Sequence, residues 1–225
     1  MKATSAFLTA AMLAASAVAV PAQTINWGSE FFSAFADSDG GLLAETSYTF
    51  ELGTFADIEP DENNTSLWYN KWRVFDRAAY TEATGYFTST VEMRDDGTSN
   101  SAALTPGAPS FEGMKAYLWV RNDNNPQPGS QWLLVRDTAW VFPAAIPGCC
   151  NNGLPIAWSV SDLDAGDVPE WGRQGGVTGP GEFTATGSFT LQTYTFPLNG
   201  QIPEPSAVVL LSLSALGFLR RRRSR

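Results

Sequence analysis

The chain contains no histidine, and this absence excludes several classes of function. Imidazole is the general base of Ser-His-Asp and Cys-His catalysis and a common zinc ligand, so neither form of catalysis nor a histidine-ligated zinc site is available. Reactions that use only carboxylates, such as glycoside hydrolysis, are not excluded.

Cysteine is limited to two adjacent residues, Cys149 and Cys150. Neighbouring Cα atoms lie about 3.8 Å apart, below the usual disulfide spacing, so a vicinal disulfide would be a strained ring that stiffens a turn. An oxidising compartment would allow this bond. Two free thiols and an intermolecular bridge remain alternatives, whereas a metal or redox role lacks further thiol or imidazole ligands.

Basic residues are scarce outside the two ends of the chain. Lys2 and five C-terminal arginines account for six of the 14 basic residues, and Glu204 accounts for one of the 23 acidic residues. The body between the ends therefore has 8 bases and 22 acids, a net charge of −14. Such a surface repels nucleic acid, so we expect no nucleic-acid partner.

Helical signals in the body are few, and strand signals replace them. Phe87–Arg94 alternates apolar and polar side chains and ends at the turn residues Asp95-Asp96-Gly97. Tyr48–Gly53 and Phe183–Phe196 show the same period of two, with threonine-rich outer faces. This alternation predicts strands that bury one side only.

Two further segments, Lys115–Val120 and Trp132–Arg136, are apolar on both faces, which is typical of central strands. Trp68–Tyr80 predicts one short helix or a strand with an irregular face, and Gly172–Gly181 predicts a surface loop. We therefore expect an all-β fold, in which residues 23–200 form a single β-sandwich or jelly-roll-like domain. An N-terminal signal helix and a C-terminal transmembrane helix would flank it.

The N-terminal end has the features of a signal peptide at residues 1–22. Lys2 supplies a positive charge, and Ala6–Val20 is an apolar stretch. Val20-Pro21-Ala22 places small residues where signal peptidase reads, which predicts cleavage after Ala22.

The C-terminal end, residues 201–225, has three successive features. A Pro-Glu-Pro motif (Pro203, Glu204 and Pro205) lies within residues 202–206. An apolar segment follows at residues 206–219, and a basic cluster at residues 220–225 begins with Arg220, Arg221, Arg222 and Arg223. The apolar segment is short for a span of about 20 residues, but arginine stems lengthen the effective span, and the cluster is typical of a cytoplasmic membrane stop.

These three features in this order resemble the sorting signal of PEP-CTERM proteins, which are exported bacterial envelope proteins. The resemblance implies that exosortase, a membrane-embedded cysteine peptidase-like enzyme, recognises Pro203, Glu204 and Pro205 as substrate residues and passes the protein to the cell surface or extracellular matrix. The segments Tyr48–Phe55, Trp68–Tyr86 and Lys115–Trp140 also resemble the body of such proteins in Verrucomicrobia-like bacteria, to which no activity is assigned.

Two features of the body suggest ligands. Asp162, Asp164 and Asp167 lie at positions 1, 3 and 6 of a loop, a spacing that suits calcium, although an ordinary acidic turn has the same appearance and the later ligands of an EF-hand are missing. Apart from structural calcium, we expect no cofactor. The eight tryptophans suggest either an aromatic core or a platform for sugar rings, and Trp171, in a loop, is the candidate for exposure.

The sequence leads to one main hypothesis and two alternatives. The main hypothesis is a non-enzymatic envelope or matrix protein with a structural or adhesive role, processed by signal peptidase and exosortase and anchored to the membrane by its C-terminus. The first alternative is a carbohydrate-binding module that binds extracellular polysaccharide. The second is a carboxylate-based glycoside hydrolase, which would need two facing carboxylates.

Overall fold

The computed structural model describes residues 23–31, 33, 35–144, 155–164, 166–175 and 190–196. Within these residues the fold is all-β with one short α-helix, so the predicted fold class is confirmed. The predicted signal helix and transmembrane helix lie outside the described residues. No helix in the described ranges has the length and apolar character needed to cross a membrane.

The elements follow one another along the chain with few helical interruptions. The strands are β1 (Gln23–Gly28), β2 (Phe35–Ala36), β3 (Thr49–Phe55), β4 (Trp72–Thr81), β5 (Tyr86–Met93), β6 (Tyr117–Arg121), β7 (Gln131–Val135), β8 (Ile156–Ser159), β9 (Arg173–Gln174), β10 (Leu191–Gln192) and β11 (Tyr194–Thr195). The helices are α1 (Thr65–Lys71) and the 3-10 turns η1 (Glu62–Asn64), η2 (Glu82–Thr84) and η3 (Val160–Asp162).

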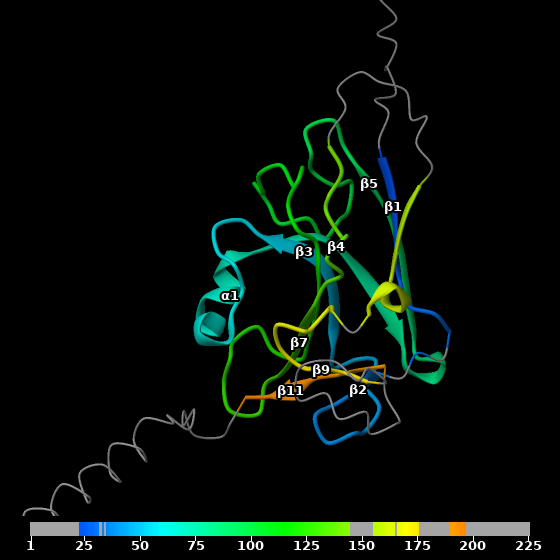
Figure 1. The fold of residues 1–225 in the computed structure, drawn as a ribbon, viewed down its shortest axis with the longest axis vertical. Helices are drawn as coiled ribbons and strands as arrows, with labels where there is room; N and C mark the ends of the chain where they lie inside the picture. The colour runs from blue at the N-terminus through cyan, green and yellow to red at the C-terminus, as the bar shows by residue number, and fades with distance from the viewer. Residues whose placement is uncertain are drawn as a thin grey trace, which may run out of the picture.

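The strands form one large sheet and one small sheet (Figure 1). The large sheet has eight strands in the order β11-β7-β6-β3-β4-β5-β1-β8. Its neighbours are antiparallel except for β1 and β8, which are parallel. The small sheet has the order β2-β10-β9, so it joins the N-terminal and C-terminal parts of the domain.

The central strands β6 and β7 are buried on both faces, as their sequences predict. Alternate residues point to opposite sides of a strand, so Leu118 and Leu133 enter one core while Trp119 and Trp132 enter another. We call the first the inner core. The second, the tryptophan cluster, comprises Phe55, Trp68, Trp72, Tyr117, Trp119, Trp132, Leu134 and Phe196.

Helix α1 supplies the outer wall of the tryptophan cluster. Trp68 is fully buried, and its ring packs against Trp132 with the centroids 5.9 Å apart. The sequence predicts either a short helix or a strand for Trp68–Tyr80, and the structure contains both. The chain is helical up to Lys71 and then enters β4.

An irregularity in β4 explains why its pattern looks uneven in the sequence. The register with β3 shifts between Leu52 and Gly53, and one extra residue of β4 sits in the shift, which is a β-bulge. Phe75 and Asp76 are consequently both buried although they are consecutive. Gly53 is required at this point, because a Cβ atom there would lie 2.3 Å from the carbonyl oxygen of Arg73.

The prediction of a surface loop for Gly172–Gly181 is wrong for its described part. Gly172 and Gln174 are buried, and Arg173–Gln174 forms β9 against β10. A strand of two residues has no alternation for a sequence pattern to reveal.

Candidate functional site

Several predicted site residues lie outside the described part of the chain. They are the motif residues Pro203, Glu204 and Pro205, the cluster Arg220, Arg221, Arg222 and Arg223, and the adjacent Cys149 and Cys150. The structure therefore bears on the acidic loop, the tryptophans and the buried carboxylates.

Each of the three aspartates in the acidic loop accepts hydrogen bonds from backbone N–H groups. Asp162 accepts from the backbone N–H of Ser159 at 2.7 Å and caps η3, and Asp164 accepts from that of Gly166 at 2.6 Å. Asp167 is buried and accepts from the N–H groups of Thr138 and Asp164. Among the residues that the structure describes, no three acidic side chains gather as a metal site would require.

Seven of the eight tryptophans are buried, with exposed fractions between 0% and 7%. Trp171, the candidate for exposure, is half-buried and stacks on Phe196 with the ring centroids 4.4 Å apart. Its indole N–H donates to the carbonyl oxygen of Tyr194 at 3.2 Å. The tryptophans thus fill cores, and Trp171 holds the end of the described chain.

The most strongly charged buried site is centred on Glu51 of β3, which is fully buried. One carboxylate oxygen accepts from Arg77 at 2.6 Å, and the other accepts from Arg121 at 2.6 Å and from the indole N–H of Trp72 at 2.9 Å. The Arg121 guanidinium lies 4.2 Å from the centroid of the Trp119 ring. We call these five residues the Glu51 ion cluster.

Burial alone would raise the pKa of Glu51, but Arg121 and then Arg77 outweigh it and lower the pKa below its usual value. The carboxylate is therefore ionised and has donors on both oxygens. Such a group is unsuited to donate a proton and is well suited to lock β3, β4 and β6 together.

The other buried carboxylate of the sheet centre does not face Glu51. Asp76 accepts from the indole N–H of Trp27 at 2.8 Å and from the Ser101 hydroxyl at 2.6 Å. Trp27 belongs to the inner core, whereas Trp72 belongs to the tryptophan cluster. Glu51 and Asp76 are therefore on opposite faces of the sheet and do not form a catalytic pair.

A second polar group lies around the edge of Tyr117, whose hydroxyl donates to Glu59 at 3.3 Å. Burial, and then the charge of Glu59, raises the pKa of Tyr117 far above its usual value. Burial also raises the pKa of Glu170, although the nearby Arg136 acts against this. Because Glu59 also pairs with Lys115, this group is an ion-pair network of the kind that structural sites often contain.

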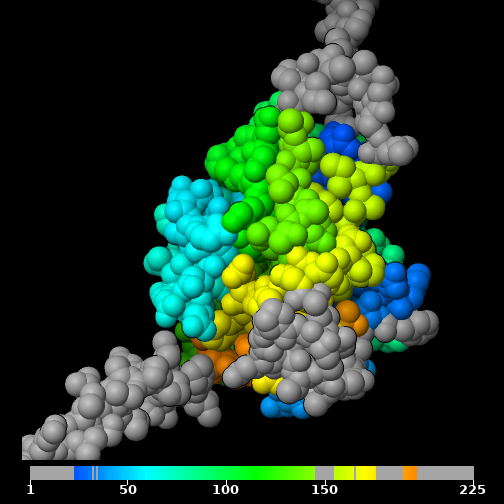
Figure 2. Space-filling model, viewed as in Figure 1, coloured from blue at the N-terminus to red at the C-terminus, as the bar shows by residue number. Residues whose placement is uncertain are grey.

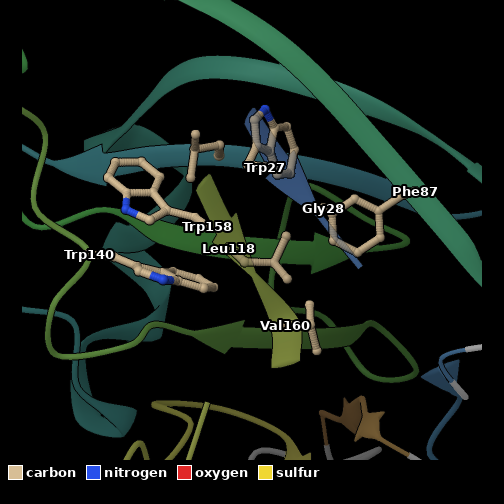
Figure 3. Close-up of a pocket in the computed structure, with 8 residues that line it drawn as sticks. Trp27, Gly28, Phe87, Leu118, Trp140, Trp158 and Val160 are labelled. Carbon is tan, nitrogen blue, oxygen red and sulfur yellow. The ribbon is translucent and has the colours of Figure 1, made fainter. Parts of the chain in front are cut away.

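The inner core leaves a small cavity lined by aromatic and aliphatic side chains (Figure 3). Its volume is about 10 Å³, and Trp140 and Trp158 stack beside it with centroids 6.2 Å apart. A cavity of this size holds one water at most and would need polar partners to do so. It is a packing defect and no ligand site.

One aromatic pair with an exposed member lies outside the two cores. Phe31 is 63% exposed and stacks on Tyr86, with ring centroids 4.2 Å apart and planes 9° from parallel. No sequence pattern indicates this pair, because the two residues lie 55 positions apart and meet only when β1 and β5 pair.

Comparison with known proteins finds a match at one end of the chain. The model of the PEP-CTERM protein-sorting motif matches residues 201–223, which confirms the resemblance stated from the sequence. No curated protein matches the chain. No solved structure matches it either.

Proposed function

From the PEP-CTERM protein-sorting motif at residues 201–223, which marks an exported protein sorted by exosortase, we propose that the folded domain is a structural or adhesive component of the cell surface. The motif is the observation that carries this proposal. The motif indicates export and processing by exosortase. The structural or adhesive role at the cell surface would belong to the folded domain.

The construction of the domain supports a passive role. Aromatic cores cover both faces of the large sheet. The fully buried carboxylate of Glu51 is neutralised by two arginines. Asp162, Asp164 and Asp167 are engaged with the backbone. A body with a net charge of −14 also stays soluble outside the cell.

Removing residues 202–225 tests the proposed route. We expect the shortened protein to appear in the growth medium after ordinary secretion, while the full chain is retained in the envelope fraction, because the deletion removes both the motif and the membrane stop. Immunoblotting of the two fractions measures this. Envelope retention of the deletion variant would contradict the proposal.

A second candidate function, binding of extracellular polysaccharide, is favoured by the Phe31–Tyr86 pair. Tyr86, Thr88 and Thr90 alternate with buried residues along β5 and so share the outer face of the sheet. Asn26 of β1 lies opposite Thr90 and accepts a hydrogen bond from its hydroxyl at 2.8 Å. A partly exposed ring pair on the same sheet face as hydroxyl and amide groups suits a sugar chain, which stacks on rings and exchanges hydrogen bonds.

Phe31→Ala tests this candidate on a glycan array, with and without calcium. If the pair binds a sugar ring, we expect affinity to fall about tenfold, the effect of losing roughly 1.4 kcal/mol of stacking. Leu42→Ala is the matched control, because Leu42 is also 63% exposed but is aliphatic and offers no ring for stacking. Absence of glycan binding by the unaltered protein, or equal loss in both variants, would reject the candidate.

A further inference from the structure

The turn that leads into α1 contains two overlapping asparagine motifs. Asn63-Asn64-Thr65 and Asn64-Thr65-Ser66 both have the form Asn-x-Ser/Thr without a proline in the middle position. This is the acceptor pattern for sugars linked to asparagine in exported proteins. The sequence does not distinguish the two asparagines, but their side chains have different surroundings in the folded domain.

Asn64 holds the turn together. Its Oδ1 accepts from the backbone N–H of Asp61 at 3.0 Å and from the indole N–H of Trp68 at 2.5 Å. Its Nδ2 donates to the carbonyl oxygen of Glu59 at 2.9 Å. Because Trp68 is fully buried in the tryptophan cluster, Asn64 lies on the inner side of the turn. A sugar bonded to its Nδ2 would disrupt these contacts, so Asn64 is a poor acceptor in this fold.

Asn63 lies one position earlier in η1 and is exposed. The Asp61 carboxylate accepts from the backbone N–H of Asn63 at 2.8 Å and from its Nδ2 at 2.6 Å. Nδ2 has a second N–H, which has no partner among the described residues. A sugar can replace this second hydrogen while the bond to Asp61 remains.

The second half of the first motif is also accessible. Thr65 is the first residue of α1 and is partly exposed. Within the part of the chain that the structure describes, its hydroxyl has no hydrogen-bond partner. The hydroxyl two positions after the asparagine is the other group that defines the acceptor pattern. Both groups of the motif Asn63-Asn64-Thr65 are therefore available.

The surface beside Asn63 has room for a sugar and an apolar side chain for it to cover. Figure 2 shows the cyan segment around α1 at the surface, along one side of the domain. η1 continues directly into α1, and residues four apart on a helix are neighbours, as the bond between Asn64 and Trp68 illustrates. The same spacing places Leu67 beside Asn63, and Leu67 is 46% exposed. A sugar on Asn63 would lie over Leu67, outside the tryptophan cluster.

We propose that Asn63 of the exported protein is glycosylated at Nδ2 by an enzyme that takes the sugar from a lipid-linked sugar diphosphate. A bond forms between Nδ2 and C1 of the sugar, while the bond between C1 and the diphosphate oxygen breaks. The electron pair of the broken bond leaves with the diphosphate, and one Nδ2 proton passes to a base of the transferring enzyme. This inference goes beyond the proposed function, because it requires export but not the structural or adhesive role.

Mass spectrometry of protein exported by the cells that naturally produce it tests the assignment. We expect the peptide that contains both motifs to carry a sugar, with fragmentation placing it on Asn63 and none on Asn64. The same digest should show that residues 1–22 have been removed, which establishes that the chain has crossed the membrane. Such protein with an unmodified Asn63 would overturn the inference and leave the proposed function untouched.

Two substitutions separate the overlapping motifs. Thr65→Ala removes the hydroxyl that Asn63 requires and leaves Asn64 and Ser66 in an intact motif. Ser66→Ala is the matched control, because it disrupts only the motif of Asn64 and changes the neighbouring, exposed position of the same helix. We expect Thr65→Ala to abolish the modification, Ser66→Ala to leave it, and Thr65→Ser to restore it. Retention of the sugar in Thr65→Ala would overturn the assignment to Asn63.

Unfolding in denaturant tests the different roles of the two asparagines without any sugar. In protein made by a host that does not glycosylate, Asn63→Gln should leave the midpoint unchanged, because the side chain is exposed. Asn64→Ala should lower the midpoint, because the buried Trp68 loses its acceptor. An equal shift in both variants would contradict the structural difference on which the assignment to Asn63 rests.

Discussion

Replacing Glu51 with glutamine should destabilise the domain by about 3–5 kcal/mol, the usual cost of removing one partner of a buried ion pair. The reason is that Arg121 is 5% exposed and would keep its charge without a carboxylate beside it. The indole N–H of Trp72 would also face a weaker acceptor. Denaturant unfolding of the purified domain measures the difference in free energy.

An exposed ion pair provides the control for this result. Lys71 and Asp57 are 38% and 62% exposed, so Asp57→Asn should change stability by less than about 1 kcal/mol. The double variant Glu51→Gln/Arg121→Gln should lose much less than the sum of the single losses, because neither charge is left unpaired. Additive losses would show that the two residues do not act as a pair.

The dependence on pH gives a second readout for Glu51. Its folded-state pKa is lowered, so its contribution is complete above the unfolded-state pKa and is lost as the pH falls through the folded-state pKa. The stability difference between the unaltered protein and Glu51→Gln should therefore shrink as the pH is lowered through this window. A constant difference would contradict the assigned ionisation.

Glu51 lies on a face of β3 whose burial the sequence pattern does not predict. The alternation of Tyr48–Gly53 correctly predicts β3 and places Glu51 on the face opposite Phe50. The prediction that this face is a polar outer face is wrong, because α1 and the tryptophan cluster cover it. Alternation along one strand separates its two faces but does not say whether a second layer covers one of them.

The parts predicted well are those with a strong local pattern. The sequence predicts β6 and β7 as central strands because both their faces are apolar, and β5 as a strand with one buried face because it alternates up to a Gly-containing turn. The small sheet and the Phe31–Tyr86 pair had no such pattern, because they depend on contacts between distant residues. The motif at residues 201–223 could be recognised because its signal is local.

Changing the sorting motif should have an all-or-none effect on processing. With Pro203, Glu204 and Pro205 all replaced by alanine, we expect exosortase to lose its recognition residues and the chain to remain in the membrane fraction with its C-terminal segment attached. Asn199→Ala is the matched control, because Asn199 lies just outside the matched residues. It should be processed at the unaltered rate.

The most direct measurement is the mass of the protein recovered from cells, with its terminal peptides identified by mass spectrometry. The predicted chain begins at Gln23 and lacks the apolar residues Ala207–Leu219, while the triple alanine variant keeps them. Recovery of unaltered protein that still carries Ala207–Leu219 and the terminal arginines as its stable form would contradict sorting through this motif.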